Sequence, residues 1–199
     1  MSCRPRLSVR GMMILVAVVL LMLGIGALTI SAWEAAIQAG CAYNLRNIGL
    51  ALHNYHSSFE SFPPATIPRP GLPPEKRLSW CVLIYSFADQ FFWDLDWNES
   101  WDSPRNRVTR GHGVEETPSI QAHCRVFECP KSPLGDEKHM PGWTSYVAIA
   151  GVGPDAPRLP KGHPRAGVFG HNRTTSMSEV SDGLSQTMMI VETTRNLGP

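Results

Sequence analysis

The first sixty residues carry two apolar patterns of different kinds, one directly after the other. Residues 12–33 hold no charged side chain. As a helix rising about 1.5 Å per residue they extend roughly 33 Å, against about 30 Å for the hydrocarbon core of a bilayer. They therefore predict a transmembrane helix. The alternative is a cleaved secretory signal, because residues 27–32 are small enough for signal peptidase, but the apolar part of such signals usually spans only about 7–15 residues.

From Trp33 onward, apolar residues recur at alternating steps of four and three, which is the helical period. This stripe consists of Trp33, Ile37, Cys41, Leu45, Ile48, Leu52, Tyr55 and Phe59. No proline interrupts residues 6–62, and Pro63 and Pro64 then end the pattern. One continuous helix is predicted, membrane-spanning over 12–33 and amphipathic over 34–62, with the stripe facing a core.

The rest of the chain predicts a proline-rich connector over 63–77 and a folded domain over 78–199. A second helix is expected within 78–97, on a stripe of Ile84, Phe87, Ala88, Phe91, Phe92 and Leu95. A polar turn follows over 97–106. Strand composition then occurs at Val126-Phe127, at 143–152, at Val168-Phe169 and at 186–192. Strands gathered after helices indicate an α+β fold, with the long N-terminal helix packed on a small antiparallel sheet.

Charge sets the expected topology and excludes one class of partner. Arg4, Arg6 and Arg10 precede the apolar segment without any acid, and the first charge beyond it is Glu34. The positive-inside rule therefore places residues 1–11 in the cytoplasm and the bulk of the chain outside it. Lys and Arg number 18 against 17 for Asp and Glu, and they are scattered along the chain. No nucleic acid is expected as a partner.

Short motifs along the chain point to one bacterial family. They are residues 41–56, Phe62-Pro63-Pro64, Ser79-Trp80, 98–104 with Asn106, 127–130, 144–147, and 181–187 with Glu192. In these the chain resembles the "domain of unknown function 1559" proteins, which usually start with a pilin-type segment, and its long helix is similar to that of type IV pilins and type II secretion pseudopilins. The resemblance implies a pilin-like fold, a place in the inner (cytoplasmic) membrane, a periplasmic domain, and association with like or unlike pilin-like subunits through the N-terminal helix.

The processing site of such pilin precursors is degenerate here. Family members resemble Gly-Phe-Thr-Leu-Ile-Glu at this site, with a glutamate at the fifth mature position. The best candidate in this chain is Gly11 followed by Met12, where Val16 occupies the glutamate position. We therefore expect poor processing at Gly11 and weak entry into filaments.

The five cysteines divide by compartment. Cys3 is expected to be cytoplasmic and reduced, and Cys41, Cys81, Cys124 and Cys129 to lie on the oxidising side. Four cysteines allow three pairings, and the residues alone leave them open. The family resemblance implies a disulfide between Cys41 and Cys129, because these two lie within the shared motifs.

Other candidate chemistry is sparse. His123, Cys124, Cys129 and His139 offer zinc-binding atoms without the regular double-pair spacing of zinc sites. Helical spacing puts His53 and His56 on one face, and Asp94, Asp96, Glu99 and Asp102 gather within nine residues. Exposed helix and turn side chains explain both groups better than a metal or calcium site.

No motif for a catalytic nucleophile, a phosphate loop, a metalloprotease helix or a dinucleotide site occurs. We therefore expect no catalysis, no cofactor and no metal. The leading hypothesis is a membrane-anchored, pilin-like or pseudopilin-like structural subunit of an envelope or secretion-type assembly. The alternative is an anchored extracytoplasmic binding module with a soluble or envelope ligand.

Overall fold

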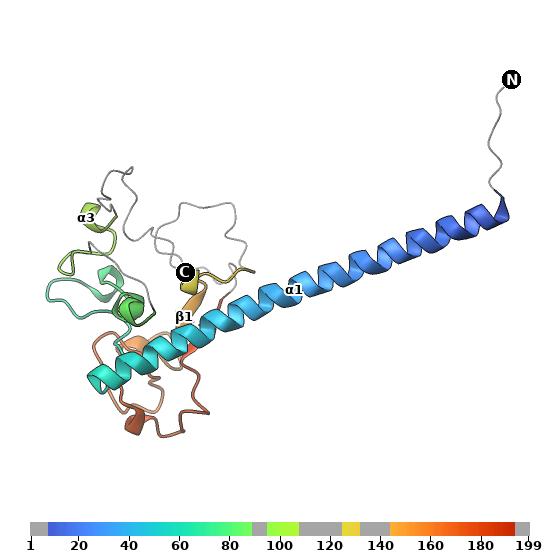
Figure 1. Cartoon of the computed structure of the whole chain (residues 1–199). Helices are drawn as coiled ribbons and strands as arrows, with labels where there is room; N and C mark the ends of the chain where they lie inside the picture. Colours follow the sequence, from blue (N-terminus) through green and yellow to red (C-terminus); the bar gives the residue numbers. More distant parts are fainter. Residues whose placement is uncertain (1–7, 89–94, 108–124, 132–143, 194–199) are drawn as a thin grey trace. The chain divides into compact units, whose positions relative to one another are not determined.

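The computed structural model describes residues 8–88, 95–107, 125–131 and 144–193 (Figure 1). The chain divides into two compact units, Met1–Gly40 and Cys41–Pro199. Helix α1, Val9–Phe59, contains 51 residues and belongs to both, because its residues up to Gly40 lie in the first unit and the remainder in the second. Each unit is described by itself.

Helix α1 begins and ends where local chemistry dictates. The hydroxyl oxygen of Ser8 accepts a hydrogen bond from the Gly11 N–H at 3.3 Å, which is the role of an N-cap side chain. At the other end, Glu60 has a φ of 58° and donates its N–H to the His56 carbonyl oxygen at 2.7 Å. A left-handed residue directly after the last turn is a common helix stop. The single proline-free helix predicted from the sequence is therefore present.

The second unit has a core built on the predicted helical stripe. Cys41, Ile48 and Leu52 are buried, and Leu45 and Tyr55 pack against them. The two ends of the stripe differ from the prediction, because Trp33 is 69% exposed and Phe59 is 58% exposed. The core is completed by residues distant in sequence: Phe62, Trp80, Cys81, Ile84, Val126, Phe127, Cys129, Tyr146, Val168 and Phe169.

The proline-rich segment after α1 is part of this unit. Pro63 and Pro64 are buried beside Phe62. The Phe62 N–H donates to the Thr175 carbonyl oxygen, and the Ala65 N–H to the Gly170 carbonyl oxygen, both at 2.8 Å. A short 3-10 helix, η1, spans Pro74–Lys76. The segment predicted as a connector is therefore held to the fold by its backbone.

The predicted second helix is shorter than its stripe. Helix α2 spans Trp80–Ile84 and continues into the 3-10 helix η2, Tyr85–Ala88. Leu95 lies outside any helix, and Phe91 and Phe92 lie outside the described residues. The predicted turn over 97–106 contains turns and ends in a short helix, α3, Pro104–Arg107. The Ser103 hydroxyl caps α3 by accepting the Asn106 N–H at 3.2 Å.

Two strands form the sheet within the described residues. Strand β1, Tyr146–Ala148, pairs antiparallel with strand β2, Ile190–Glu192, so that Tyr146 lies opposite Glu192. Both fall inside predicted strand segments, and the α+β class is confirmed. The strand predicted at Val126-Phe127 is wrong, because these residues belong to the 3-10 helix η4, Arg125–Phe127. Two further 3-10 helices are η6, Ala156–Arg158, and η7, Met177–Glu179.

The strand predicted at Val168-Phe169 is also wrong, for a reason the structure makes plain. Both residues are buried, but their carbonyl oxygens are used by side chains: Thr175 donates to that of Val168 at 2.8 Å and Arg173 to that of Phe169 at 2.6 Å. Arg173 also donates to the carbonyl oxygen of Gly167 at 3.0 Å. With these acceptors satisfied locally, the segment needs no neighbouring strand.

Candidate functional site: the apolar helix segment and the disulfide junction

The first unit presents apolar side chains on every side of α1. Its most apolar 18-residue window is long and apolar enough to cross a membrane, and none of that window is buried. The exposed large side chains include Met13, Leu21 and Leu28. A helix that is apolar all round needs either a core or a lipid environment. The segment thus fits a membrane anchor or a signal sequence by length and composition.

The few polar groups of this segment are satisfied within the helix. The Thr29 hydroxyl donates to the Gly26 carbonyl oxygen at 2.8 Å, and the Ser31 hydroxyl donates to the Leu28 carbonyl oxygen at 3.0 Å. In a bilayer, polar groups must find partners inside the protein because no water is present. These hydroxyls meet that condition without help from another chain.

The candidate processing residues lie in the first turns of α1. Gly11 is half-buried, and Met12 and Val16 are exposed. Gly11 belongs to helix α1, and its N–H donates to the Ser8 hydroxyl, so it does not lie in an extended segment.

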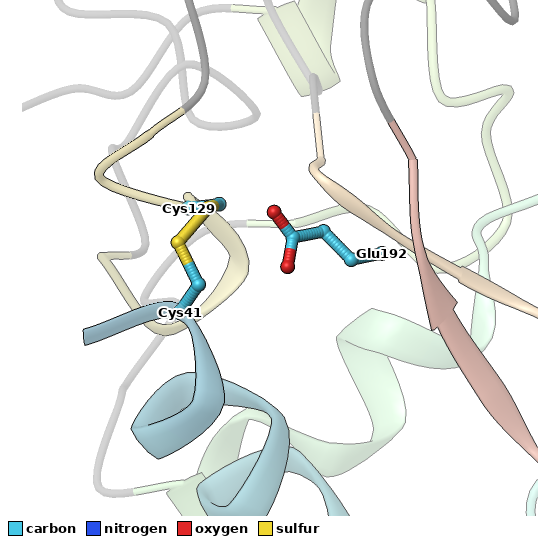
Figure 2. A group of neighbouring side chains, drawn as sticks. All are labelled: Cys41, Cys129 and Glu192. Carbon is cyan, nitrogen blue, oxygen red and sulfur yellow. A yellow bond between two sulfur atoms is a disulfide. The ribbon is translucent and has the colours of Figure 1, made fainter. Parts of the chain in front are cut away.

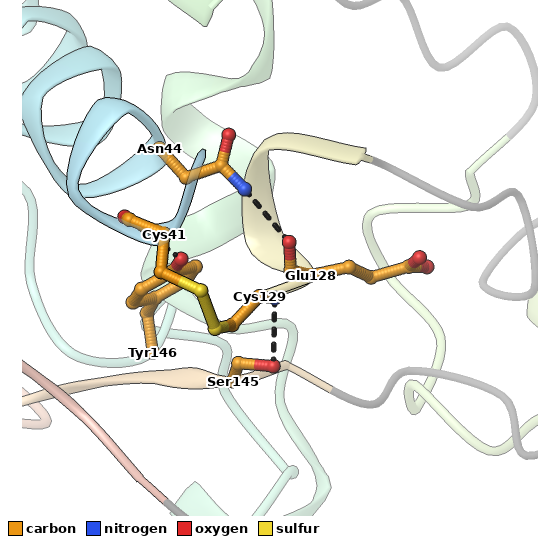
Figure 3. The surroundings of a disulfide bond; sticks show 6 residues. All are labelled: Cys41, Asn44, Glu128, Cys129, Ser145 and Tyr146. Carbon is orange, nitrogen blue, oxygen red and sulfur yellow. Dashed lines mark hydrogen bonds between the residues drawn. A yellow bond between two sulfur atoms is a disulfide. The ribbon is translucent and has the colours of Figure 1, made fainter. Parts of the chain in front are cut away.

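The second unit contains a disulfide between Cys41 and Cys129, the pair that the family resemblance implies. Its surroundings form what we call the disulfide junction: Cys41, Asn44, Glu128, Cys129, Ser145 and Tyr146 (Figure 3). Asn44 donates its amide to the Glu128 carbonyl oxygen at 2.7 Å, and the Ser145 hydroxyl accepts the Cys129 N–H at 3.0 Å. The turn that carries Cys129 is therefore held from both sides by α1 and by the residue before β1.

Tyr146 is the buried centre of the disulfide junction. It is fully buried, and its hydroxyl donates to the Cys41 carbonyl oxygen at 3.1 Å. Burial raises the pKa of this phenol above its ordinary value, the hydrogen bond with Asn44 opposes the shift, and the charge of Glu192 adds to it. The phenol thus serves as a neutral hydrogen-bond donor that ties β1 to α1.

At the disulfide junction, three side chains carry atoms of the kinds that can bind a metal ion. The sulfur atoms of Cys41 and Cys129 and a carboxylate oxygen of Glu192 lie within 4.8 Å of one another (Figure 2). Because the two sulfurs are bonded to each other, neither is a thiolate, and thiolates are what metals bind. The group therefore works as a covalent cross-link beside a carboxylate.

The remaining candidates from the sequence have structural roles or fall outside the described residues. His123, Cys124, His139 and Asp94 lie outside them. The rings of His53 and His56 contact Phe62, and His56 Nε2 accepts the Met177 N–H at 3.1 Å. These two histidines therefore help to close the core.

The acidic turn after Leu95 is held by cations of the chain itself. Asp102 pairs with Lys76, and Asp96 lies 3.2 Å from the Arg105 guanidinium. The ion pair and hydrogen bond with Lys76, followed by that with Ser100, lower the pKa of the Asp102 carboxyl. Asn106, fully buried, accepts the Asp96 N–H at 2.7 Å and donates to the Ser100 carbonyl oxygen at 3.0 Å. The turn is ordered by these contacts.

Sequence reasoning missed Arg173 entirely. Its guanidinium is buried and donates to the carbonyl oxygens of Ala150, Ala156, Leu159, Gly167 and Phe169 at 2.6–3.2 Å. A side chain placed on Gly170 would overlap the Arg173 side chain, which its hydrogen bonds hold in place, so that position favours glycine. A lone arginine among polar residues carries no sequence signal of such a role.

The described residues therefore form an α+β unit that is closed by a Cys41–Cys129 disulfide and preceded by an apolar helix long enough to cross a membrane. The profile of the family described as "Protein of unknown function (DUF1559)" matches residues 30–198, and the chain belongs to that family. Comparison with curated proteins and with solved structures found no match.

Proposed function

We propose that this protein is a membrane-anchored structural subunit of a bacterial envelope assembly, similar to a pilin or pseudopilin, that acts through packing rather than catalysis. The observation that carries the proposal is the first unit, whose apolar side chains are exposed on every side. In water so large an apolar surface drives aggregation, whereas in a bilayer it is stable.

The proposed topology follows from charge. Arg10 lies at the start of α1, Arg4 and Arg6 precede it, and Glu34 is the first charge after the apolar segment. Basic residues stay on the cytoplasmic side, so residues 41–199 lie outside the cytoplasm. There the Cys41–Cys129 disulfide forms in an oxidising compartment.

The topology is tested with reporters fused after Pro199. An enzyme that is active only in the periplasm is expected to be active there. Activity of a cytoplasm-only reporter at the same position, with silence of the periplasmic one, would contradict the topology. Fusions at Arg10, before the apolar segment, serve as the reverse control.

Subunit contacts are proposed along one side of the helix. Ala27, Ser31 and Ala35 recur at intervals of four and are all exposed. Small residues at this spacing let two helices approach closely within a membrane. This face supports packing of the helix against that of another subunit.

The contact is tested by cross-linking in intact membranes. Ala27→Leu combined with Ser31→Leu widens the proposed face and should reduce cross-linked dimers and higher species at least fivefold. Ala32→Leu combined with Ala36→Leu adds similar volume on other sides of α1 and should leave them unchanged. Equal effects of the two pairs, or cross-links unaffected by either, would reject self-association through this face.

A further inference from the structure

A groove in the second unit has a volume and a set of lining residues that the proposed structural role does not require. It has a volume of about 580 Å³, and three prolines, Pro74, Pro157 and Pro160, contribute to its walls. Proline fixes the backbone φ angle, so these walls are conformationally restricted before any ligand arrives. Sites that bind small molecules typically have volumes of about 300–1,000 Å³. We call this feature the basic groove.

Every ionisable side chain that lines the basic groove is basic. These residues are Arg158, Lys161, His171 and Arg173, and no acidic residue is among the lining. Burial lowers the pKa of His171, and the charges of Arg158, Arg77 and Arg173 lower it further against the opposing effect of Glu75. The His171 imidazole therefore lies within electrostatic reach of the Glu75 carboxylate and of three guanidinium groups, two of which, those of Arg158 and Arg173, belong to the groove lining.

Arg173 supplies a positive charge that its own hydrogen bonds do not neutralise. Arg173 is buried and is among the residues that line the groove, and the acceptors described above are all backbone carbonyl oxygens. A charge held away from water acts over a longer distance than an exposed one. Arg173 thus adds a formal positive charge to the lining of the groove.

The two exposed cations at the groove are held in place by acids from outside it. Arg158 lies 2.8 Å from a Glu75 carboxylate oxygen, and Lys161 lies 2.8 Å from one of Glu179. Both pairs are largely exposed, and exposed pairs are weak. An incoming anion can therefore share or replace these partners, while Asn172 and Thr174 add uncharged polar groups to the lining.

From these observations we infer that the basic groove binds a small oxyanion ligand carrying phosphate or carboxylate. Guanidinium and ammonium groups recognise both through charge-assisted hydrogen bonds. No aromatic side chain other than the His171 imidazole lines the groove, so it lacks the stacking surface on which single-stranded nucleic acid binds. This inference goes beyond the proposed structural role and does not depend on it.

Isothermal titration of the full chain in a non-ionic detergent, at fixed ionic strength, tests the inference. Glucose 6-phosphate and citrate are the two anionic probes, and glucose is the neutral one. Saturable binding of either anion, with none for glucose, is the expected result. Binding of glucose 6-phosphate alone assigns a phosphate ligand, and binding of citrate alone assigns a carboxylate ligand. Saturable binding of neither anion, or equal binding of glucose, would overturn the inference.

Variants locate the binding to the groove. Arg158→Ala combined with Lys161→Ala should weaken the affinity at least tenfold. The matched control, Arg46→Ala combined with Arg105→Ala, removes the same charge from exposed positions outside the lining and should change the affinity less than twofold. An equal loss in both double variants would show general charge screening and overturn the inference.

A second variant gains rather than loses affinity, so a folding defect cannot imitate it. Glu179→Gln removes the carboxylate that pairs with Lys161 but keeps a side chain able to accept the Ser176 N–H in the capping box. The affinity for the anion should rise about threefold. An unchanged or weaker affinity would contradict the proposal that Lys161 binds the anion in competition with Glu179.

Discussion

The two units of this chain share one helix but use it in opposite ways. In residues 9–40 the apolar side chains point outward, and none of the most apolar window is buried. In residues 41–59 the apolar side chains of Cys41, Ile48 and Leu52 point into a core. Most of the exposed side chains in this range are polar. The difference teaches that the environment of α1, rather than its helical propensity, changes between Gly40 and Cys41. The apolar side chains of residues 9–40 are left without a protein core around them, whereas those of residues 41–59 form part of one.

The largest expected effect comes from placing charge in the first unit. Leu21→Arg combined with Met22→Arg should shift most of the protein out of carbonate-washed membranes, because each arginine near the centre of a spanning helix costs about 2.5–3.5 kcal/mol. Leu50→Arg, at a position of α1 that is exposed in the second unit, is the control and should leave the membrane fraction unchanged. Equal losses from both would remove the distinction between the two units.

Removing the disulfide should destabilise the second unit alone. Cys41 and Cys129 are 88 residues apart, and closing a loop of that length contributes about 4 kcal/mol in the loop-entropy model. Cys41→Ala combined with Cys129→Ala should lower the free energy of unfolding by about this amount, measured by tryptophan fluorescence in urea. The membrane fraction should stay the same. An unchanged urea midpoint would mean that the covalent link is dispensable.

Arg173→Ala should cost about 3 kcal/mol of unfolding free energy. The substitution leaves buried carbonyl oxygens without donors, and buried unsatisfied acceptors are costly. Arg105→Ala removes an exposed arginine and should change stability by less than about 0.5 kcal/mol. Arg173→Lys tests geometry, since a lysine has three donors and no planar fork. Near wild-type stability of the lysine variant would show that charge alone suffices at this position.

Tyr146→Phe should have the smallest effect, about 1 kcal/mol, because it removes one hydrogen bond to the Cys41 carbonyl oxygen and keeps the ring. Burial raises the pKa of this phenol above its ordinary value of 10.0. The folded state therefore favours the neutral phenol, and this contribution is present below pH 10 and lost as the pH rises above it. Urea midpoints at pH 8 and pH 10.5 should differ less in Tyr146→Phe than in the wild type. An equal difference would assign the alkaline loss to other groups.

The sequence patterns predicted the elements that depend on local sequence. They failed where side chains distant in the sequence determine the backbone conformation. The continuous helix and the buried middle of its stripe follow from apolar spacing and from the absence of proline, and the positions of both strands follow from residue composition. Val168-Phe169 looks like a strand, yet Arg173 and Thr175 take its carbonyl oxygens. Val126-Phe127 looks like a strand too, but it forms a 3-10 turn that leads to Cys129, which the disulfide fixes.

The functional features also divide into those visible in contiguous sequence and those assembled only by folding. The apolar segment and the candidate residues Gly11, Met12 and Val16 are contiguous and visible in the sequence. The basic groove is assembled from Pro74, from residues 157–161 and from residues 171–174, and only folding brings these segments together. Scattered basic residues in a nearly neutral chain give no sign of such a cluster.

Retention of the apolar segment is the central claim, and the intact mass of the protein extracted from native membranes tests it most directly. The account predicts a chain that keeps residues 12–33 together with the basic residues before them, because Val16 stands where pilin precursors carry glutamate. A methylated start at Met12 would show normal processing and contradict the expected permanent N-terminus. A chain that begins after residue 32 would show a cleaved signal and contradict the anchor itself.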